Sequence, residues 1–273
     1  MPVCCEYKDP NMPITTCVFD AYGTLFDVAA TARLAAQEGH DTALADQWQK
    51  LAEIWRDKQL QYTWLRAITQ EHCDFWQVTQ DGLDFALEAL SLDKNDARRE
   101  RLLQLYWELQ AYDEVPDMLF RLKEMGMKTA ILSNGSPAML DAAVASAGLG
   151  GYLDAILSVE RVGVFKPNSR VYDLVGQHFN CVSQEVLFVS ANGWDAAGAT
   201  GYGFETAWVN RNNIPLDRLP HRPKHRLSTL HSLPNWRKAD ATFYQLRWSV
   251  AFLQRYRPWS AFTLPVRPDA QFG

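Results

Sequence analysis

The stretch CVFDAYGTLFD, residues 17–27, carries the first feature that decides the fold. The segment ITTCVFD (14–20) is rich in β-branched and apolar residues and ends just before a glycine turn, which predicts a short buried strand. A single carboxylate, Asp20, stands at the carboxyl end of that strand. Its position needs a reason, because a buried charge is costly unless it is paired.

Four more strand-like runs follow, and helix-like segments separate them. The runs cover residues 128–134, 154–160, 185–192 and 205–210. Helices are predicted from the N-cap Ser136 to Gly148, over about 168–179, and from about Asp195. Strands that alternate with helices pair in parallel. We therefore predict an α/β fold with a doubly wound, mainly parallel, Rossmann-like sheet.

The segment between the first and second strands has a different character. It is nearly free of Gly and Pro, and Trp48, Leu51 and Trp55 recur at helical spacing. We predict a helical cap at residues 30–111, inserted into a core domain of residues 13–29 and 112–236. Residues 237–273 form an unusual C-terminal extension. Its apolar positions are spaced for one helix face, at Phe243, Leu246, Val250 and Leu253.

Composition excludes several classes of function. The net charge of −5 gives no reason to expect binding to nucleic acid or to a membrane surface. No apolar run is long enough to cross a membrane, and the first twelve residues lack the apolar core of a signal peptide. The five cysteines, at positions 4, 5, 17, 73 and 181, show no zinc or disulfide pattern. A reducing cytoplasm is the expected location.

Polar residues follow three of the predicted strands at their carboxyl ends, where open α/β sheets bind ligands. They are Asp20, then Ser133 and Asn134, then Ser190, Asn192 and Asp195. Helix capping is the alternative explanation for these residue types, but three clusters in one topological position favour an active site. Lys166, in a loop before a predicted helix, is expected at the same edge, where it would keep Asp20 ionised and nucleophilic.

With these residues in place, the sequence resembles the haloacid dehalogenase superfamily and, within it, the L-2-haloacid dehalogenases. The resemblance runs from about residue 14 to residue 233. Five blocks carry it in order: FDAYGTLFDV, WRDKQLQYTWLR, AILSNGSP, FKPNSRVY and FVSANGWDAAGA. The first block alone indicates only the superfamily, whereas the block with Arg56 and the NGWD block are specific to the subfamily. The resemblance implies a haloacid dehalogenase-like core with a helical cap.

Most members of the superfamily are phosphatases, and two positions argue against that activity here. Such phosphatases carry a second Asp two residues after the nucleophile to protonate the leaving alkoxide, and this chain has Tyr22 there. They also use an acid for Mg²⁺ at the position of Ser190. A halide needs no proton, so neither a metal nor another cofactor is expected. A Mg²⁺-dependent phosphatase and a non-catalytic binding protein remain the alternatives.

The resemblance implies a role for each site residue. Asp20 attacks C2 of a short L-2-haloalkanoic acid, and water then hydrolyses the ester to a D-2-hydroxy acid. Lys166 neutralises Asp20, Asp195 activates the water with Asn192, and Ser133 binds the substrate carboxylate. Arg56, Asn134 and Trp194 receive the halide. The residues expected to position Asp20 are Thr24, Ser190 and Asn192, with Tyr172 nearby.

An apolar pocket for the substrate's alkyl group is implied at Tyr22, Leu60, Phe75 and Trp194. Simple alternatives stay open: ordinary cap packing for Leu60 and Phe75, and a plain helix-face aromatic for Tyr172. Ala191 stands where relatives often carry a second Ser, which would remove one hydrogen bond. The expected partners are the 2-haloacid, halide, water and a second copy of the chain.

Overall fold

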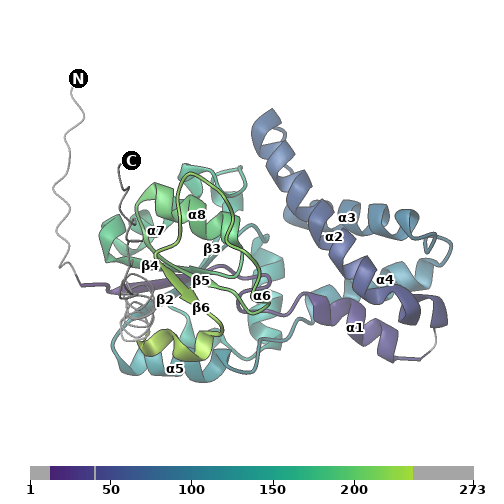
Figure 1. Ribbon diagram of the computed structural model, residues 1–273, viewed down its shortest axis with the longest axis horizontal. Coiled ribbons are helices and arrows are strands. Elements are labelled where there is room, and N and C mark those ends of the chain that lie inside the picture. The colour runs from purple at the N-terminus through teal and green to yellow at the C-terminus, as the bar shows by residue number, and fades with distance from the viewer. Residues whose placement is uncertain (1–12, 40, 236–273) are drawn as a thin grey trace, which may run out of the picture. The chain divides into compact units, whose positions relative to one another are not determined.

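Six parallel strands form one sheet in the order β3-β2-β1-β4-β5-β6 (Figure 1). The computed structural model describes residues 13–39 and 41–235. The strands are β1 (Thr16–Phe19), β2 (Lys128–Ser133), β3 (Ala155–Ser158), β4 (Val186–Ser190), β5 (Glu205–Val209) and β6 (His225–Leu227). The predicted α/β fold with a doubly wound Rossmann-like sheet is confirmed.

Strand β1 lies at the centre of the sheet and pairs with both β2 and β4. Its last residue, Phe19, is in register with Ile131 on one side and Val189 on the other. All four β1 residues are buried, as the short β-branched run predicts. The connections reverse direction on either side of β1, and ligand sites in such sheets lie at this switch point. Asp20 follows β1 directly at that point.

Four helices connect the strands of the sheet. They are α5 (Val115–Glu124), α6 (Pro137–Ser146), α7 (Ser169–Phe179) and α8 (Gly193–Tyr202). In Figure 1, α5 lies below the sheet while α7 and α8 lie above it. The remaining helical segments are short 3-10 turns: η1 (Gly150–Tyr152), η2 (Val159–Arg161), η3 (Ser183–Glu185) and η4 (Leu230–Asn235).

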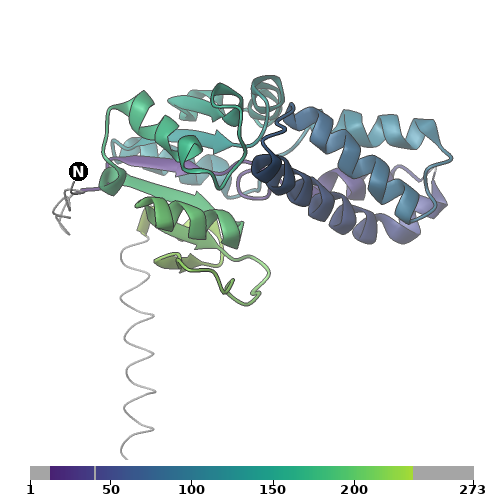
Figure 2. The same cartoon turned by 90° about the horizontal axis from the view of Figure 1, so that it is seen from above.

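In the described residues, the regular elements between β1 and α5 are all helices, as predicted (Figure 2). It contains α1 (Ala29–Gln37), α2 (Thr42–Thr69), α3 (Phe75–Ala89) and α4 (Asp96–Trp107). Helices α2 and α3 approach closely at Gly82, where an added Cβ would lie 3.3 Å from the Trp55 carbonyl oxygen. Residues through Pro234 belong to one compact unit, so the boundaries drawn at residues 30 and 111 stay a prediction.

Three local features of the structure were not predicted. Helix α8 begins at Gly193, two residues before the predicted start, so Asp195 lies inside its first turn. Ser136 is the N-cap of α6, but its side chain makes no capping hydrogen bond. Strand β6 was not predicted. Its three residues are a partly exposed addition to the edge of β5, without the apolar alternation that marks a strand.

Some predictions fall on residues that the structure does not describe. The C-terminal extension at 237–273 and the cysteines at positions 4 and 5 lie outside the described residues. Within the described ranges, no helix has the length and apolar character needed to cross a membrane.

Helix α2, which carries Arg56, is anchored at its first turn by Asp41. The Asp41 carboxylate accepts a hydrogen bond from the Leu44 N–H (3.0 Å) as the N-cap. It also pairs with Arg98 of α4 through two bonds, of 2.5 and 2.8 Å. The hydrogen bond from Arg98 holds the pKa of Asp41 below its usual value, against the opposing effect of burial.

We expect Asp41→Asn to lower the free energy of unfolding by about 1 kcal/mol at pH 7, because asparagine keeps the cap and loses the ion pair. A lowered folded-state pKa stabilises the protein above the unfolded value of 3.8, and that stabilisation is lost as the pH falls through the folded value. The difference between the two proteins should therefore shrink below about pH 4.

Urea unfolding at a series of pH values measures this difference. Asp46→Asn, at an exposed position on the same helix, is the matched control and should change little at any pH. A deficit for Asp41→Asn that persists unchanged at pH 3 would show that the ion pair with Arg98 is not its cause.

Candidate active site

Asp20 is presented by a tight turn that the sequence GTLF builds directly after β1. The N–H groups of Thr24, Leu25 and Phe26 all donate to the Ala21 carbonyl. Gly23 has a φ of +84°, a conformation that favours glycine. An added Cβ there would also lie 2.9 Å from Nη2 of Arg56. The glycine of the motif is thus required both by the turn and by the arginine packed against it.

The Asp20 carboxylate is buried and held by three donors. Oδ2 accepts hydrogen bonds from the Thr24 hydroxyl (2.8 Å) and from Nδ2 of Asn192 (2.9 Å). Oδ1 accepts from the ammonium group of Lys166 (3.2 Å). These residues come from the loops after β1, β3 and β4, so the predicted convergence at one sheet edge is observed for them. The carboxylate is fixed in orientation.

Lys166 is 1% exposed and lies between two carboxylates. Its Nζ is 2.9 Å from Oδ2 of Asp195, in addition to its contact with Asp20. Burial disfavours its charge, but attraction from Asp195 and Asp20 outweighs burial and holds the pKa of Lys166 above its usual value. A lysine before proline is usually solvated, and here the two acids explain its burial.

Asp195 is fully buried in the first turn of α8. Besides Lys166, it accepts a 2.8 Å hydrogen bond from the Tyr172 hydroxyl on α7. Burial raises the pKa of Asp195, and Lys166 offsets part of that effect. The phenol of Tyr172 also has its pKa raised, first by burial and then by Asp195. Tyr172 is therefore a hydrogen-bond donor to Asp195 and not only an aromatic side chain on one face of α7.

The second strand end contributes Ser133 and Asn134. Ser133 is buried, and its Oγ accepts from the Gly135 N–H (3.1 Å). Oδ1 of Asn134 accepts from the backbone N–H of Lys166 (3.0 Å). This bond joins the loop after β2 to the loop that carries the lysine. A Cβ on Gly135 would collide with the Tyr22 ring, so the loops after β1 and β2 are also packed together.

Ser190 and Ala191 shape the loop after β4. Ser190 Oγ accepts from the Asn192 N–H (3.1 Å), so it positions Asn192 and does not itself donate to Asp20. The backbone N–H of Ala191 donates to the Thr24 hydroxyl (2.9 Å), which in turn donates to Asp20. The main chain of residue 191 thus supports the nucleophile through Thr24.

Arg56 reaches this edge of the sheet from α2. Its Nη2 donates to Oδ1 of Asn192 at 2.7 Å, while the amide nitrogen of the same Asn192 donates to Asp20. The bond between Arg56 and Asn192 was not predicted, and it links the inserted helices directly to the nucleophile. Trp194 follows on α8, where its ring packs edge-on against Trp64 of α2 with centroids 5.4 Å apart. The Trp194 Nε1–H is buried and has no acceptor in the described part of the chain.

Aromatic rings surround the approach to Asp20. Tyr22 stacks on Phe75 of α3 (centroids 5.7 Å apart) and contacts Tyr106 of α4 at the same distance. Phe75 also contacts Phe165, the residue before the buried lysine, at 6.2 Å. Leu60 lies half-buried on α2, one turn after Arg56. The structure therefore brings Tyr22 and Phe75 together.

The hydroxyl of Tyr22 is buried and finds no hydrogen-bond partner within residues 13–39 and 41–235. Its pKa is raised well above the usual value, first by burial and then by Tyr106 and Asp20. A phenol with a raised pKa is a weaker acid than an ordinary tyrosine. Tyr22 is therefore a poor substitute for the carboxylic acid that protonates a leaving alkoxide.

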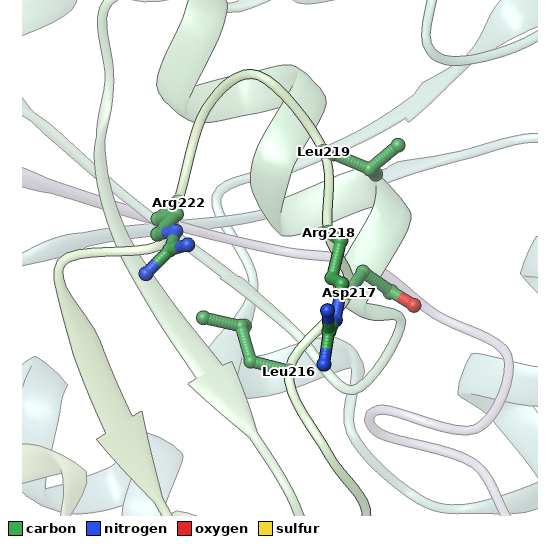
Figure 3. Close-up of a pocket in the computed structure, with 5 residues that line it drawn as sticks. All are labelled: Leu216, Asp217, Arg218, Leu219 and Arg222. Atoms are coloured by element: carbon green, nitrogen blue, oxygen red, sulfur yellow. The ribbon is translucent and has the colours of Figure 1, made fainter.

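A cavity of about 320 Å³ lies in the loop after β5 (Figure 3). It is lined by Leu216, Asp217, Arg218, Leu219 and Arg222. The Asp217 carboxylate lies against Gly193 at the start of α8 and leaves no room there for a side chain. None of the predicted site residues lines this cavity. The cavity is therefore not part of the candidate site.

Two contributors were missed by the sequence analysis. Tyr106 contacts Tyr22, and Phe165 contacts Phe75; both Tyr106 and Phe165 are buried. Tyr106 lies one helical turn after the buried Leu102, so its helical spacing was the available signal. Phe165 directly precedes Lys166 in the block FKPNSRVY, and this position was the available signal for it.

In the described ranges, no group of three or more His, Cys, Asp or Glu side chains is arranged to hold a metal ion.

Comparisons with known proteins show the family of the chain. The family model of haloacid dehalogenase-like hydrolases matches residues 14–203. An (S)-2-haloacid dehalogenase of Pseudomonas sp. (strain YL) is 41% identical over 215 residues, which cover 79% of this chain and 90% of that protein. One from Burkholderia cepacia is 38% identical over 220 residues, with 81% and 93% coverage.

Solved structures give the same result. The L-2-haloacid dehalogenase from Xanthobacter autotrophicus, solved with chloropropionic acid covalently bound, superimposes with a TM-score of 0.72. The two sequences are 35% identical, and the match covers 81% of this chain and 97% of that one.

We expect Lys166→Met to lower the free energy of unfolding by about 3–5 kcal/mol at neutral pH, because it leaves two buried carboxylates without a cation. In the parent protein the raised pKa of Lys166 stabilises the fold at all pH values below 10.5, and this stabilisation is lost as the pH rises through the folded value. Its removal raises the pKa of Asp195 further.

An acid with a raised folded-state pKa destabilises the folded state increasingly as the pH rises above its unfolded value. The deficit of Lys166→Met should therefore grow between about pH 4 and pH 8. Urea unfolding across this range tests it, with the exposed Lys50→Met as the matched control. A deficit that is the same at both ends of the range would contradict the charge-based explanation.

Proposed function

This chain belongs to the haloacid dehalogenase-like hydrolases and, within them, to the (S)-2-haloacid dehalogenases, and we propose that it hydrolyses short L-2-haloalkanoic acids to D-2-hydroxy acids with release of halide. The observation that carries the proposal is the Asp20 carboxylate, buried at the end of β1 and held by Thr24, Asn192 and Lys166. A carboxylate that is held in one orientation beside a cation is suited to nucleophilic attack.

In the first step, a carboxylate oxygen of Asp20 attacks C2 of the substrate from the side opposite the halogen. A C2–O bond forms while the carbon–halogen bond breaks, and the halide leaves with the bonding electrons. This step inverts C2 and produces an ester on Asp20. Lys166 contributes by offsetting the repulsion between the Asp20 carboxylate and the anionic substrate.

In the second step, water attacks the carboxyl carbon of the Asp20 ester. The bond between that carbon and the ester oxygen breaks, so the product keeps an oxygen from Asp20 and the configuration at C2 is unchanged. Asp195, which contacts Lys166 and Tyr172, is the group we assign to orient this water and take its proton. Its pKa is raised by burial, which makes it a stronger base than an ordinary aspartate.

Binding of the substrate is assigned to two groups of residues. Ser133 and the nearby backbone N–H groups at the start of α6 receive the substrate carboxylate. Arg56, Asn134 and Trp194 receive the halide. The unpartnered Trp194 Nε1–H supports this assignment, because a buried donor without an acceptor is a favourable site for an anion. Tyr22, Leu60 and Phe75 form the apolar wall for the alkyl group.

A Mg²⁺-dependent phosphatase is the alternative enzyme on this fold. The raised pKa of Tyr22 counts against it, since the position of the general acid holds a weak acid. A non-catalytic binding protein is the other alternative. The fully buried Lys166 and Asp195 beside Asp20 count against it, because burying three charges is costly for a protein that only binds.

Halide release from L-2-chloropropionate in excess chelator tests the proposed function. The parent protein should release one halide per D-lactate formed, while Asp20→Asn should lose at least about a thousandfold in rate, because the nucleophile is gone. Thr69→Ala, at an exposed position on α2, is the control variant. Phosphate release from an aryl phosphate with Mg²⁺, in the absence of halide release, would establish the alternative.

Two further measurements on the same enzyme test the mechanism. A single turnover in ¹⁸O-labelled water should place the label in Asp20 and not in the product. Label found in the product of the first turnover would mean that water attacks C2 directly. Equal rates on the D and L substrates would contradict the proposed stereochemistry.

We also propose that the chain forms a homodimer through an apolar patch on α2 and α3. The patch consists of Leu65, Ile68 and Phe85, which are 51%, 76% and 40% exposed. Leu65 also lines a hollow of about 280 Å³, together with Tyr62, Arg66 and Asp81. Large apolar side chains left exposed on two neighbouring helices are typical of interfaces, and a second copy would bury them symmetrically.

Ile68→Glu should convert the dimer to a monomer, because it places a charge in the interface. Light scattering during gel filtration measures the mass. Phe120→Glu, at another exposed apolar position (49% exposed) on α5, should leave the mass unchanged. A parent protein that elutes as a monomer would refute the dimer and leave the proposed reaction intact.

A cytoplasmic location remains part of the proposal. Its support is that Cys17, Cys73 and Cys181 are free thiols in the described structure, as a reducing compartment would keep them.

A further inference from the structure

Arg211 lies just after β5, outside every block that carries the family resemblance, yet it contacts the turn that holds the nucleophile. Its Nη1 donates to the Gly23 carbonyl (3.2 Å), and its Nη2 donates to the Thr24 carbonyl (3.1 Å). Thr24 is the residue whose hydroxyl donates to Asp20. One guanidinium therefore binds the backbone of the turn at Gly23 and at Thr24, the residue that donates directly to the nucleophile.

The same guanidinium also contacts the chain where it returns from the inserted helices. Nη2 donates to Oε1 of Glu114 (3.0 Å), and the guanidinium lies over the Tyr112 ring, 3.8 Å from its centroid. The two connections between the sheet and the helices are themselves joined, because the Tyr112 N–H donates to the Leu25 carbonyl (3.0 Å). Arg211 thus links the end of β5 to both connections: the one that leaves β1 for the helices and the one that returns from them to the sheet.

Glu114 is held in place by contacts of its own. Its Oε1 also accepts from the Thr229 hydroxyl (3.1 Å) and the Leu230 N–H (3.4 Å). Burial opposes its charge, but hydrogen bonds from its own backbone, Arg211 and Thr229 hold its pKa below the usual range. An ionised Glu114 gives the arginine a fixed counter-charge, so the fork of the guanidinium is preorganised toward the two carbonyls.

Gly23 lies between two arginines. Its carbonyl oxygen accepts from Arg211, while its Cα faces Arg56, which would be 2.9 Å from an added Cβ. A shift of this turn would therefore move the Thr24 hydroxyl that donates to Asp20. It would also move the Gly23 backbone against which Arg56 packs.

We propose that Arg211 is a positioning residue for the dehalogenation, and that it fixes the turn at Gly23 and Thr24 so that Asp20 and Arg56 hold their reactive geometry. This inference rests on the proposed function. The guanidinium acts through Thr24 and does not touch substrate. A displacement of about 1 Å in a reacting group can lower a rate by about a hundredfold, so a residue two contacts away from the chemistry can still control it.

Arg211→Met and Arg211→Lys test the proposal in the full-length protein. With enzyme in excess over L-2-chloropropionate, the rate constant of halide release reports the chemistry of the folded molecules, whatever fraction is folded. It should fall about 10- to 100-fold in Arg211→Met with KM changed less than about threefold. Arg211→Lys should recover only part of the rate, because an ammonium cannot bridge two carbonyls and a carboxylate as a planar fork does.

Arg226→Met is the matched control. Arg226 lies on β6 near the same loop, where it bonds to Asn213 and covers Trp208, away from the turn at Gly23. It should keep the parent rate constant. An equal loss in Arg226→Met would overturn the proposal. So would a parent-like rate constant in Arg211→Met accompanied only by a lower urea midpoint, because that result describes a purely structural residue.

Glu114→Gln keeps the test decisive if Arg211→Met does not fold. It retains both carbonyl contacts of Arg211 and removes the counter-charge, so the rate constant should fall about three- to tenfold. An unchanged rate constant in this variant would also overturn the proposal. A parent protein that releases no halide would refute the proposed function itself, which is a different outcome from an active parent with unaffected variants.

Discussion

The ammonium group of Lys166, buried between Asp20 and Asp195, is the interaction on which the rest of the site depends. Two carboxylates this close would repel each other if both were ionised without a cation between them. Arg56, which donates to Asn192, brings a second positive charge, so the site holds two carboxylates and two cationic side chains. An anionic substrate adds one negative charge beyond this balance, which explains why neutral donors at Ser133 and the start of α6 are needed as well.

The order of the strands makes this charge arrangement possible. The central position of β1, between β2 and β4, lets the loops after β2 and β4 reach Asp20 from either side. Lys166 arrives from the loop after β3 and is tied to Asn134 by its own backbone N–H. Asp20, Lys166 and Asp195 thus come from three different strand connections. The inserted helices supply Arg56 and most of the aromatic wall, so the two parts of the fold divide the site between them.

Much of this arrangement could be predicted from local sequence. The strand before Asp20, the polar strand ends and the helical insert all have short-range signals, and the family resemblance assigned roles to the residues. Contacts between distant segments had no such signal. The bonds from Arg56 to Asn192 and from Arg211 to Gly23 span 136 and 188 residues, and neither arginine differs locally from a surface residue. The burial of Lys166 and the added strand β6 depend likewise on partners that only the folded sheet brings together.

The length of α2 between its anchor and its functional residue has a consequence for how such chains can change. Asp41 fixes the first turn of the helix, and Arg56 reaches Asn192 from four turns further along. Inserting one residue between them would rotate the guanidinium by about 100° around the helix axis and advance it by about 1.5 Å. Length variation should therefore be excluded from this segment of α2, because even a one-residue change would point Arg56 away from Asn192.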